Sequence, residues 1–214
     1  MLIYYHGHSE FLVETAKGQR VLFDPFPKSV NFPMRRVKAD AVAVSHHHFD
    51  HDYTAKVDGD PVIVDTEGKH TPLDGITLTG FPAFHDAEGG KQRGEILCFL
   101  LEADSLKVLH LGDLGMVPDE ALITRLFMPD ILFVPVGGTY TLDAAQAAQT
   151  VKILQPRVTI PMHYKTEQGG ISRITNLDPF LEQMKPSAPS YQPLLRVTRE
   201  DLSQQPRLLV LSPL

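Results

Sequence analysis

Residues 45–51 read Ser45-His46-His47-His48-Phe49-Asp50-His51, which contains the pattern H-x-H-x-D-H. The preceding residues, Asp40-Ala-Val-Ala-Val44, are apolar and partly β-branched, so they predict a buried strand that ends where the histidines begin. Crowded imidazoles repel one another when protonated, whereas a divalent cation binds them in their neutral form. The pattern therefore predicts a metal-binding loop at a strand end, rather than a histidine-rich surface tract.

Further candidate ligands also follow apolar runs. They are His85 after 76–84, Asp113 after 106–111 and His163 after 158–160. Rigid scaffolds hold metal sites with side chains from several regular elements, here the ends of separate strands. The candidates exceed what one tetrahedral site can use. We therefore expect two ions, each with roughly three to four protein ligands and an open position.

The order of these motifs along the chain resembles the metallo-β-lactamase-fold hydrolase superfamily. The resemblance runs from His6-Gly-His-Ser9 and Leu22-Phe-Asp-Pro25 to Met162-His-Tyr-Lys165. Three motifs are similar to one bacterial and archaeal branch, related to the ascorbate-6-phosphate lactonase group: His110-Leu-Gly-Asp-Leu-Gly115, Pro135-Val-Gly-Gly-Thr-Tyr-Thr141 and Ile160-Pro-Met-His-Tyr-Lys165.

One position departs from the pattern of the superfamily. Many members have Gly shortly after the Asp-His pair, whereas this chain continues with Asp52-Tyr53. The departure disfavours a glyoxalase II or transfer-RNA processing activity and favours the lactonase or phospholipase D-like branches.

The resemblance implies an α+β fold, the αββα four-layer sandwich of two mixed sheets with outer helices. It also implies one metal ion held by His46, His48 and His85. A second ion would be held by Asp50, His51 and His163, with Asp113 bridging the pair. This set of imidazoles and carboxylates without thiolate suits Zn²⁺, with Mn²⁺ or Fe²⁺ as alternatives.

Short apolar segments separated by turn residues predict strands over 2–5, 11–14, 20–23, 42–45, 61–64, 76–79, 94–102, 106–111, 131–135, 158–160 and 207–211. The last of these is expected at a sheet edge. Helices are predicted from Pro118 to residue 127, over 144–154 with Asp143 as the N-cap, and over 177–184. Strands and helices interspersed in two halves predict two packed sheets with helices outside.

Length and composition fit one domain over residues 1–214, which is large enough to bury about 70% of its unfolded surface. The formal charge of −6 disfavours nucleic acid and anionic membranes as partners, so a small molecule is the expected one. The lone cysteine, Cys98, lies in an apolar run and is expected to be a buried, inert thiol. The first residues resemble neither a signal peptide nor a membrane span, which favours a cytoplasmic location. The oligomeric state is left open.

Hydrolysis is the expected reaction. Water bound to such a centre can reach a pKa of about 7, which provides a metal-bound hydroxide at neutral pH without a side-chain nucleophile. Asp50 would orient this water or accept its proton. The Tyr140 hydroxyl would stabilise an oxyanion, or the ring would only pack. The expected substrate is a small anionic metabolite with an ester, lactone or phosphodiester bond.

Several other residues near these motifs have two interpretations. Asp24 either accepts a hydrogen bond from the histidine loop or only forms a turn. His8 either lines the pocket or only forms a turn, and His110 either supports the site or packs on its strand. Gly137-Gly138 is expected to let the backbone approach the site closely.

The remaining histidines are expected to lie outside the metal cluster. His47 should point away from its neighbours, and His70 should lie at the surface. The role of His6 is left open.

Two other functions remain open. A di-iron oxidoreductase on the same fold would use overlapping ligands, but such enzymes usually need a flavin or rubredoxin-like unit, and none is fused here. A non-catalytic metal-binding protein is the second alternative. It is disfavoured because a domain of this length needs no metal to fold, so an open site indicates a reaction.

Overall fold

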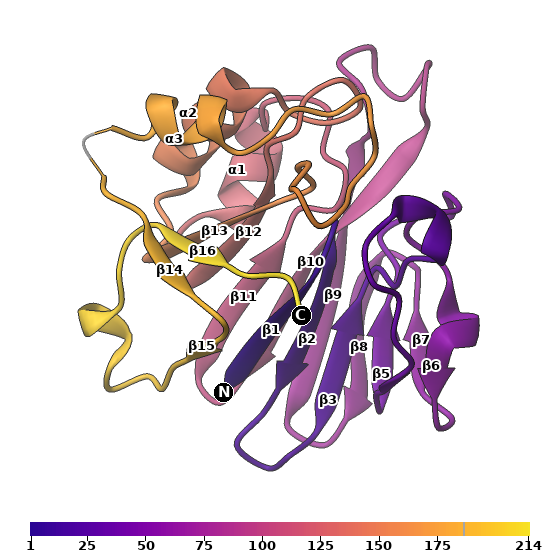
Figure 1. Ribbon diagram of the computed structural model, residues 1–214. Helices are drawn as coiled ribbons and strands as arrows, with labels where there is room; N and C mark the ends of the chain where they lie inside the picture. Colours follow the sequence, from indigo (N-terminus) through magenta and orange to yellow (C-terminus); the bar gives the residue numbers. More distant parts are fainter. Residues whose placement is uncertain (186) are drawn as a thin grey trace.

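The computed structural model describes residues 1–185 and 187–214, and its main feature is a pair of stacked sheets (Figure 1). Within these residues each large sheet has six strands. The first sheet runs in the order β15 (Leu195–Arg196), β1 (Leu2–Gly7), β2 (Glu10–Glu14), β3 (Arg20–Phe23), β5 (Ala41–Ala43) and β7 (Val62–Val64). The second runs β13 (Val158–Met162), β12 (Ile131–Pro135), β11 (Leu106–His110), β10 (Glu95–Ala103), β9 (Ile76–Phe84) and β8 (Gly68–Leu73).

Both sheets are mixed in the same way. Strands β15, β1, β2 and β3 pair antiparallel, whereas β3, β5 and β7 are parallel to one another. Likewise β8 to β11 pair antiparallel, and β11, β12 and β13 are parallel. The carboxyl ends of parallel strands meet at one edge of a sheet, where ligand sites commonly form. Each sheet therefore offers several strand ends for a shared site.

The main core lies between the two sheets. Alternation in β1 buries Ile3 and Tyr5, and Phe11 of β2 stacks on Phe133 of β12 with ring centroids 3.8 Å apart. This contact joins the inner faces of the two sheets. A period of two buries one face of β1 and β9, whereas β5, β12 and β13 are buried on both faces, and apolar residues from both sheets meet in one layer.

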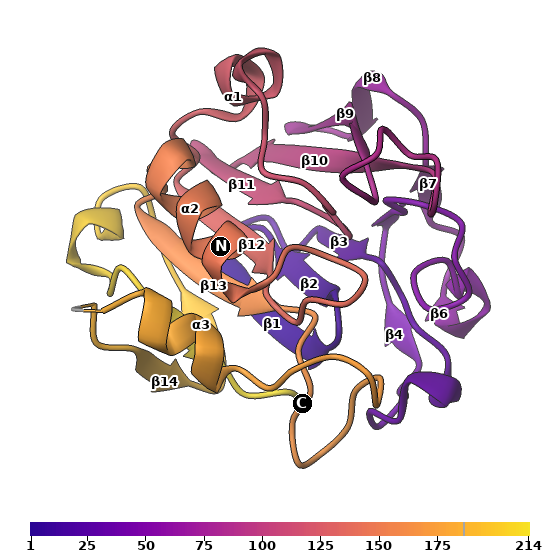
Figure 2. The same cartoon turned by 90° about the horizontal axis from the view of Figure 1, so that it is seen from above.

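Helices α1 (Glu120–Leu126) and α2 (Ala144–Leu154) pack against the second sheet, and α3 (Asp178–Gln183) packs against α2 (Figure 2). Asp143 and Gln146 form a capping box that satisfies free N–H groups at the start of α2. Asp119 caps α1 by accepting from the Leu122 N–H at 2.8 Å.

A smaller apolar cluster covers the outer face of the first sheet. It joins Leu22 and Val42 of that sheet to Val37 and Val57. The last two belong to the short strands β4 (Val37–Lys38) and β6 (Val57–Asp58), and the 3-10 turn Thr54–Lys56 directly precedes β6. Two other 3-10 turns, Lys28–Val30 and Leu202–Gln204, contribute to other apolar clusters. Among the described residues, this outer layer is thus built from short strands and turns.

The structure confirms the predicted fold class, an α+β sandwich of two mixed sheets, and most predicted strands with small shifts at their ends. The prediction of an edge strand over 207–211 is wrong. Strand β16 (Leu209–Leu211) pairs with β14 (Ser190–Gln192), while Leu208 bridges Thr159 of β13. Strand β8, which contains the partly buried His70, was not predicted because its sequence is polar.

Candidate metal centre

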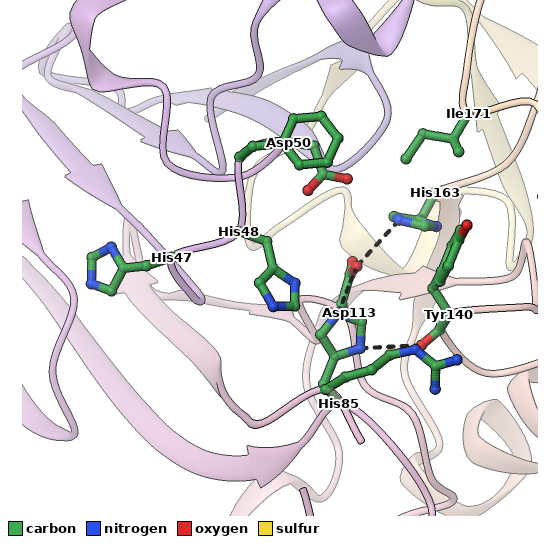
Figure 3. Close-up of a pocket in the computed structure, with 10 residues that line it drawn as sticks. His47, His48, Asp50, His85, Asp113, Tyr140, His163 and Ile171 are labelled. Carbon is green, nitrogen blue, oxygen red and sulfur yellow. Dashed lines mark hydrogen bonds and ion pairs between the residues drawn. The ribbon is translucent and has the colours of Figure 1, made fainter. Parts of the chain in front are cut away.

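The candidate ligands lie at the strand ends where the two sheets meet, and Figure 3 shows part of this cluster. From the first sheet, His8 follows β1, Asp24 follows β3, and residues 46–51 follow β5. From the second sheet, His85 follows β9, Asp113 follows β11, Tyr140 follows β12, and His163 follows β13. The structure therefore brings together all seven predicted ligands, although they span most of the chain.

One group consists of His46, His48 and His85, whose potential ligand atoms lie within 4.8 Å of one another. His46 and His85 are buried, while His48 is exposed toward the pocket. The Nδ1–H of His85 donates to the Tyr140 carbonyl at 3.1 Å. This bond fixes the ring and leaves Nε2 free to bind a cation.

A second group consists of His8, Asp50, His51 and His163, which are all buried and meet the same distance limit. His8 was an open question in the sequence. Its side chain is fully buried, and its Nε2 lies 3.1 Å from Asp50 Oδ2. The Gly7-His8 motif near the first strand indicated that His8 could line the pocket. Local sequence could not reveal its partner Asp50, which is 42 residues away.

Asp113 lies between the two groups. Its Oδ2 atom is 3.2 Å from His163 Nε2, 3.3 Å from His51 Nε2 and 3.4 Å from His85 Nε2. Its Oδ1 atom is buried without a hydrogen-bond partner among the described residues. A carboxylate in this position can contact cations held by either group.

Asp24 supports the cluster from behind. Its Oδ2 accepts from the Nδ1–H of His51 at 2.9 Å and from the Ser45 hydroxyl at 2.6 Å, and its Oδ1 accepts from the Ser45 N–H at 2.7 Å. The Ser45 oxygen in turn lies 2.9 Å from His46 Nδ1. Asp24 therefore does what the sequence suggested as one option: it bonds to the histidine loop.

The electrostatics favour neutral rings at some positions and charge at others. Burial, together with the neighbouring His51, lowers the pKa of His46 to about 3, and burial with His163 lowers that of His8 to about 4. Burial alone would lower the pKa of His51, but Asp113 and Asp24 raise it well above its usual value. Burial alone would raise the pKa of Asp113, but His163 and His51 bring it well below its usual value.

The histidines His6, His47 and His110 lie outside the two groups of candidate ligands. His110 Nε2–H donates to the Ser9 carbonyl at 2.9 Å, and its Nδ1 accepts from the Gly112 N–H at 3.0 Å. Both ring nitrogens are therefore used, and His110 supports the backbone beside the site. His47 turns away from the cluster, as predicted, and is 66% exposed (Figure 3). His6 bonds to the buried Glu10 at 2.6 Å.

Close backbone approach helps to form the site. A Cβ atom on Gly137 would lie 2.1 Å from the His163 carbonyl oxygen, and one on Gly115 would lie 2.3 Å from that of His85. The close approach predicted for Gly137-Gly138 is thus confirmed at Gly137 but not at Gly138, where a Cβ atom would meet Asp143 at an ordinary 3.7 Å. His8, Asp24 and His163 have positive φ angles, which non-glycine residues adopt at a cost. Such strain is common at functional sites.

A pocket of about 470 Å³ opens over the cluster. Its lining residues are His47, His48, Phe49, Asp50, His85, Arg93, Asp113, Tyr140, His163 and Ile171. The volume is in the range of small-molecule sites. The Tyr140 side chain lines this pocket, so the structure places it where the sequence predicted, beside the candidate ligands (Figure 3).

Two observations indicate that these residues suit divalent metal ions: buried atoms without a hydrogen-bond partner, and the chemistry of the side chains. His46 Nε2 and His51 Nε2 are buried without a hydrogen-bond partner among the described residues, as is Asp113 Oδ1. Buried polar atoms are almost always satisfied, so these atoms require a partner that the protein itself does not supply. Imidazole nitrogens and carboxylate oxygens in this number suit Zn²⁺, Mn²⁺ or Fe²⁺.

Comparisons with known proteins agree with this geometry. A family model described as the β-lactamase superfamily domain matches residues 2–163. A UPF0173 metal-dependent hydrolase of Archaeoglobus fulgidus is 34% identical, over 78% of this chain and 84% of the relative. A UPF0173 metal-dependent hydrolase of Pyrococcus abyssi is 31% identical, over 75% of this chain and 83% of the relative.

A solved structure from Thermotoga maritima is similar over nearly its whole length. It is described as a candidate Zn-dependent hydrolase of the metallo-β-lactamase superfamily. It is 31% identical, with a TM-score of 0.79, and the match covers 98% of this chain and 97% of that one. The predicted relation to the ascorbate-6-phosphate lactonase group stays a prediction.

Proposed function

Because the chain belongs to the UPF0173 metal-dependent hydrolases of the metallo-β-lactamase superfamily, we propose that it is a dinuclear metal-dependent hydrolase. Its two divalent ions would serve to cleave an ester, lactone or phosphodiester bond in a small anionic metabolite. The observation that carries the proposal is Asp113, whose Oδ2 lies within 3.4 Å of histidines from both candidate groups. A carboxylate between two dications offsets their mutual repulsion.

In this proposal His46, His48 and His85 hold one ion. Asp50, His51 and His163 hold the other, with Asp113 between them and His8 positioning Asp50 through its 3.1 Å contact. Both sheets contribute ligands, which supports a single catalytic domain over residues 1–214. Two such ions, when bound, lower the pKa of water to about 7 and polarise the scissile bond.

The protein residues have separate tasks. Burial alone would raise the pKa of Asp50. The hydrogen bond from His8 and the charge of His51 outweigh this effect, so the pKa lies below its usual value. A carboxylate with such a low pKa is a weak base, which favours Asp50 as a ligand and an orienting acceptor rather than as a general base. The Tyr140 hydroxyl, on the pocket wall, is proposed to donate to the developing oxyanion.

The substrate class follows from the size and charge of the pocket. A volume of about 470 Å³ suits a small molecule. Two dications make the pocket locally positive, while the chain as a whole has a charge of −6 and lacks the overall basic charge that would attract a polynucleotide. In the described part of the chain, none of the helices is both long and apolar enough to cross a bilayer.

The test combines metal analysis with an activity panel. Protein purified without added chelator should contain close to two divalent ions, with Zn²⁺ the expected metal. The panel contains bis(4-nitrophenyl) phosphate, a sugar-phosphate lactone, a thioester and a β-lactam, each with Zn²⁺ or Mn²⁺ supplied. Turnover of the phosphodiester or lactone, lost in chelator and restored by metal, supports the proposal.

Three results would contradict it. A single tightly held ion under metal-replete conditions argues against the dinuclear site. Turnover of only the thioester or β-lactam argues against the substrate class. Bound iron with oxygen reduction and no hydrolysis would favour the di-iron oxidoreductase, and tight metal binding without any turnover would favour a non-catalytic protein.

A further inference from the structure

The wall of the metal pocket includes an arginine, Arg93, that has no part in the ligand set. Among the described residues, Arg93 forms no ion pair with any carboxylate, although the chain carries an excess of acidic groups. Arginine remains charged at all physiological pH values. The pocket therefore contains a permanent positive charge that the protein itself does not neutralise.

The backbone of Arg93 is held firmly in place. The Asp86 carboxylate accepts from the Glu88, Gly90, Gln92 and Arg93 N–H groups at 2.8 to 3.0 Å. Asp86 itself directly follows His85, and the His85 N–H donates to the Gly94 carbonyl at 3.0 Å. The loop that carries Arg93 is thus tied at both ends to a candidate metal ligand.

The guanidinium group is held on one side and open on the other. Its Nη2 donates to the Thr139 carbonyl at 3.2 Å, and its Cζ lies 5.7 Å from the centre of the Tyr140 ring. These contacts place the group beside Tyr140 at the pocket, while most of its five N–H donors have no protein acceptor in the described residues. The side chain is only half-buried, so these donors can reach a ligand.

We propose that Arg93, positioned beside the Tyr140 ring, forms a subsite for an anionic group of the substrate, a carboxylate or a phosphate, separate from the bond that is cleaved at the metal cluster. The inference rests on the proposed function and specifies its substrate class. The planar guanidinium suits bidentate binding of either anion. Phe49, which is 63% exposed, and Ile171 provide apolar surface in the same pocket for the remainder of the substrate.

The test measures binding rather than turnover. The metal-loaded full chain is titrated with 4-fluorobenzoate and with the neutral 4-fluorobenzamide, followed by fluorine NMR. The wild type should bind the anion about tenfold more tightly than the amide, as expected for a charge-assisted bidentate pair. Arg93→Gln should abolish this preference, and Arg93→Lys should retain part of it.

A matched control is available in the same chain. Arg125 also lies over an aromatic ring, with its Cζ 5.6 Å from the centre of Phe81, but it lines a different pocket. Arg125→Gln should leave the preference for the anion unchanged. Circular dichroism and metal content, matched to the wild type, confirm that each variant is folded and loaded.

Two results overturn the inference. One is equal or absent binding of the two probes by the wild type. The other is an undiminished preference for 4-fluorobenzoate in Arg93→Gln, which would place the carboxylate on the metal ions instead. Because no turnover is measured, either result is distinguishable from failure of the proposed hydrolysis.

Discussion

The Nδ1 atom of His51 lies 2.9 Å from Oδ2 of Asp24, a carboxylate that is fully buried behind the metal cluster. This contact turns the His51 Nε2 atom toward Asp113, at 3.3 Å. Through Ser45, the same carboxylate also reaches His46. One residue therefore orients a candidate ligand of each proposed ion.

Substituting Asp24 should weaken metal binding without removing a ligand. We expect Asp24→Ala to reduce metal affinity roughly 10- to 100-fold, the effect typical of lost outer-shell partners. Competition with a metal-binding dye measures it. Asp74→Ala is the control, because that side chain is 91% exposed and, within the described residues, pairs with Lys17 alone. Unchanged affinity in Asp24→Ala would refute the supporting role.

Removing Asp113 should abolish most activity while the fold persists. The positive charges of the two ions would be less compensated in Asp113→Ala, so metal should bind less tightly and turnover should fall by at least about 100-fold. His70→Ala should change little, since the contacts of that ring within the described residues are to Thr66 and Glu67, next to its own strand. Wild-type turnover in Asp113→Ala at matched metal content would contradict the ligand assignment.

A buried ion pair should anchor the histidine loop. Lys56, just beyond the loop, is 2% exposed, and its Nζ lies 2.6 Å from Oε2 of the fully buried Glu10. Glu10 also accepts from the Phe26 N–H at 3.1 Å. Lys56→Ala should destabilise the protein by about 3–5 kcal/mol, because it removes the lysine charge that compensates the buried Glu10 carboxylate.

Urea unfolding of the metal-free protein measures this effect, with Lys17→Ala as the exposed control. The double variant Lys56→Met, Glu10→Leu should be less destabilised than Lys56→Ala, since neither charge then remains buried. Equal losses for Lys17→Ala and Lys56→Ala would show that the buried pair contributes little.

The metal-free protein should be most stable near neutral pH. In the folded state the pKa of His8 is about 4 and that of His46 about 3, below the usual 6.5. The unfolded chain therefore binds more protons as the pH falls below about 6.5, so stability decreases toward pH 4. His51 has a raised pKa, and its contribution is fully present below about 6.5 and is lost as the pH rises through the folded pKa.

Urea midpoints in chelator at pH values of about 5, 6.5 and 8 provide the measurement. The midpoint at about pH 5 should lie clearly below that at 6.5. A midpoint that rises on acidification would mean that the buried histidines are charged in the folded state.

Much of the architecture was predictable from local sequence. The apolar strands and the capped helix at Asp143 are determined by short-range patterns, because period and capping depend on neighbouring residues. The same holds for the H-x-H-x-D-H loop, whose spacing alone indicated metal binding. Strand β8 was not predicted because its residues are largely polar and show no apolar pattern. It forms because it pairs with β9, not because its side chains are buried.

Only the tertiary structure decided how the distant segments complete the site. Four contacts join residues that are 21 to 101 positions apart in the sequence. They are His8 with Asp50, Asp24 with Ser45, His110 with the Ser9 carbonyl, and Arg93 with the Tyr140 ring. The edge position expected for residues 207–211 failed for the same reason, since β13 and β14 lie on either side of that segment. Local patterns determine which face of an element is buried, whereas the partner on that face depends on the packing of the two sheets.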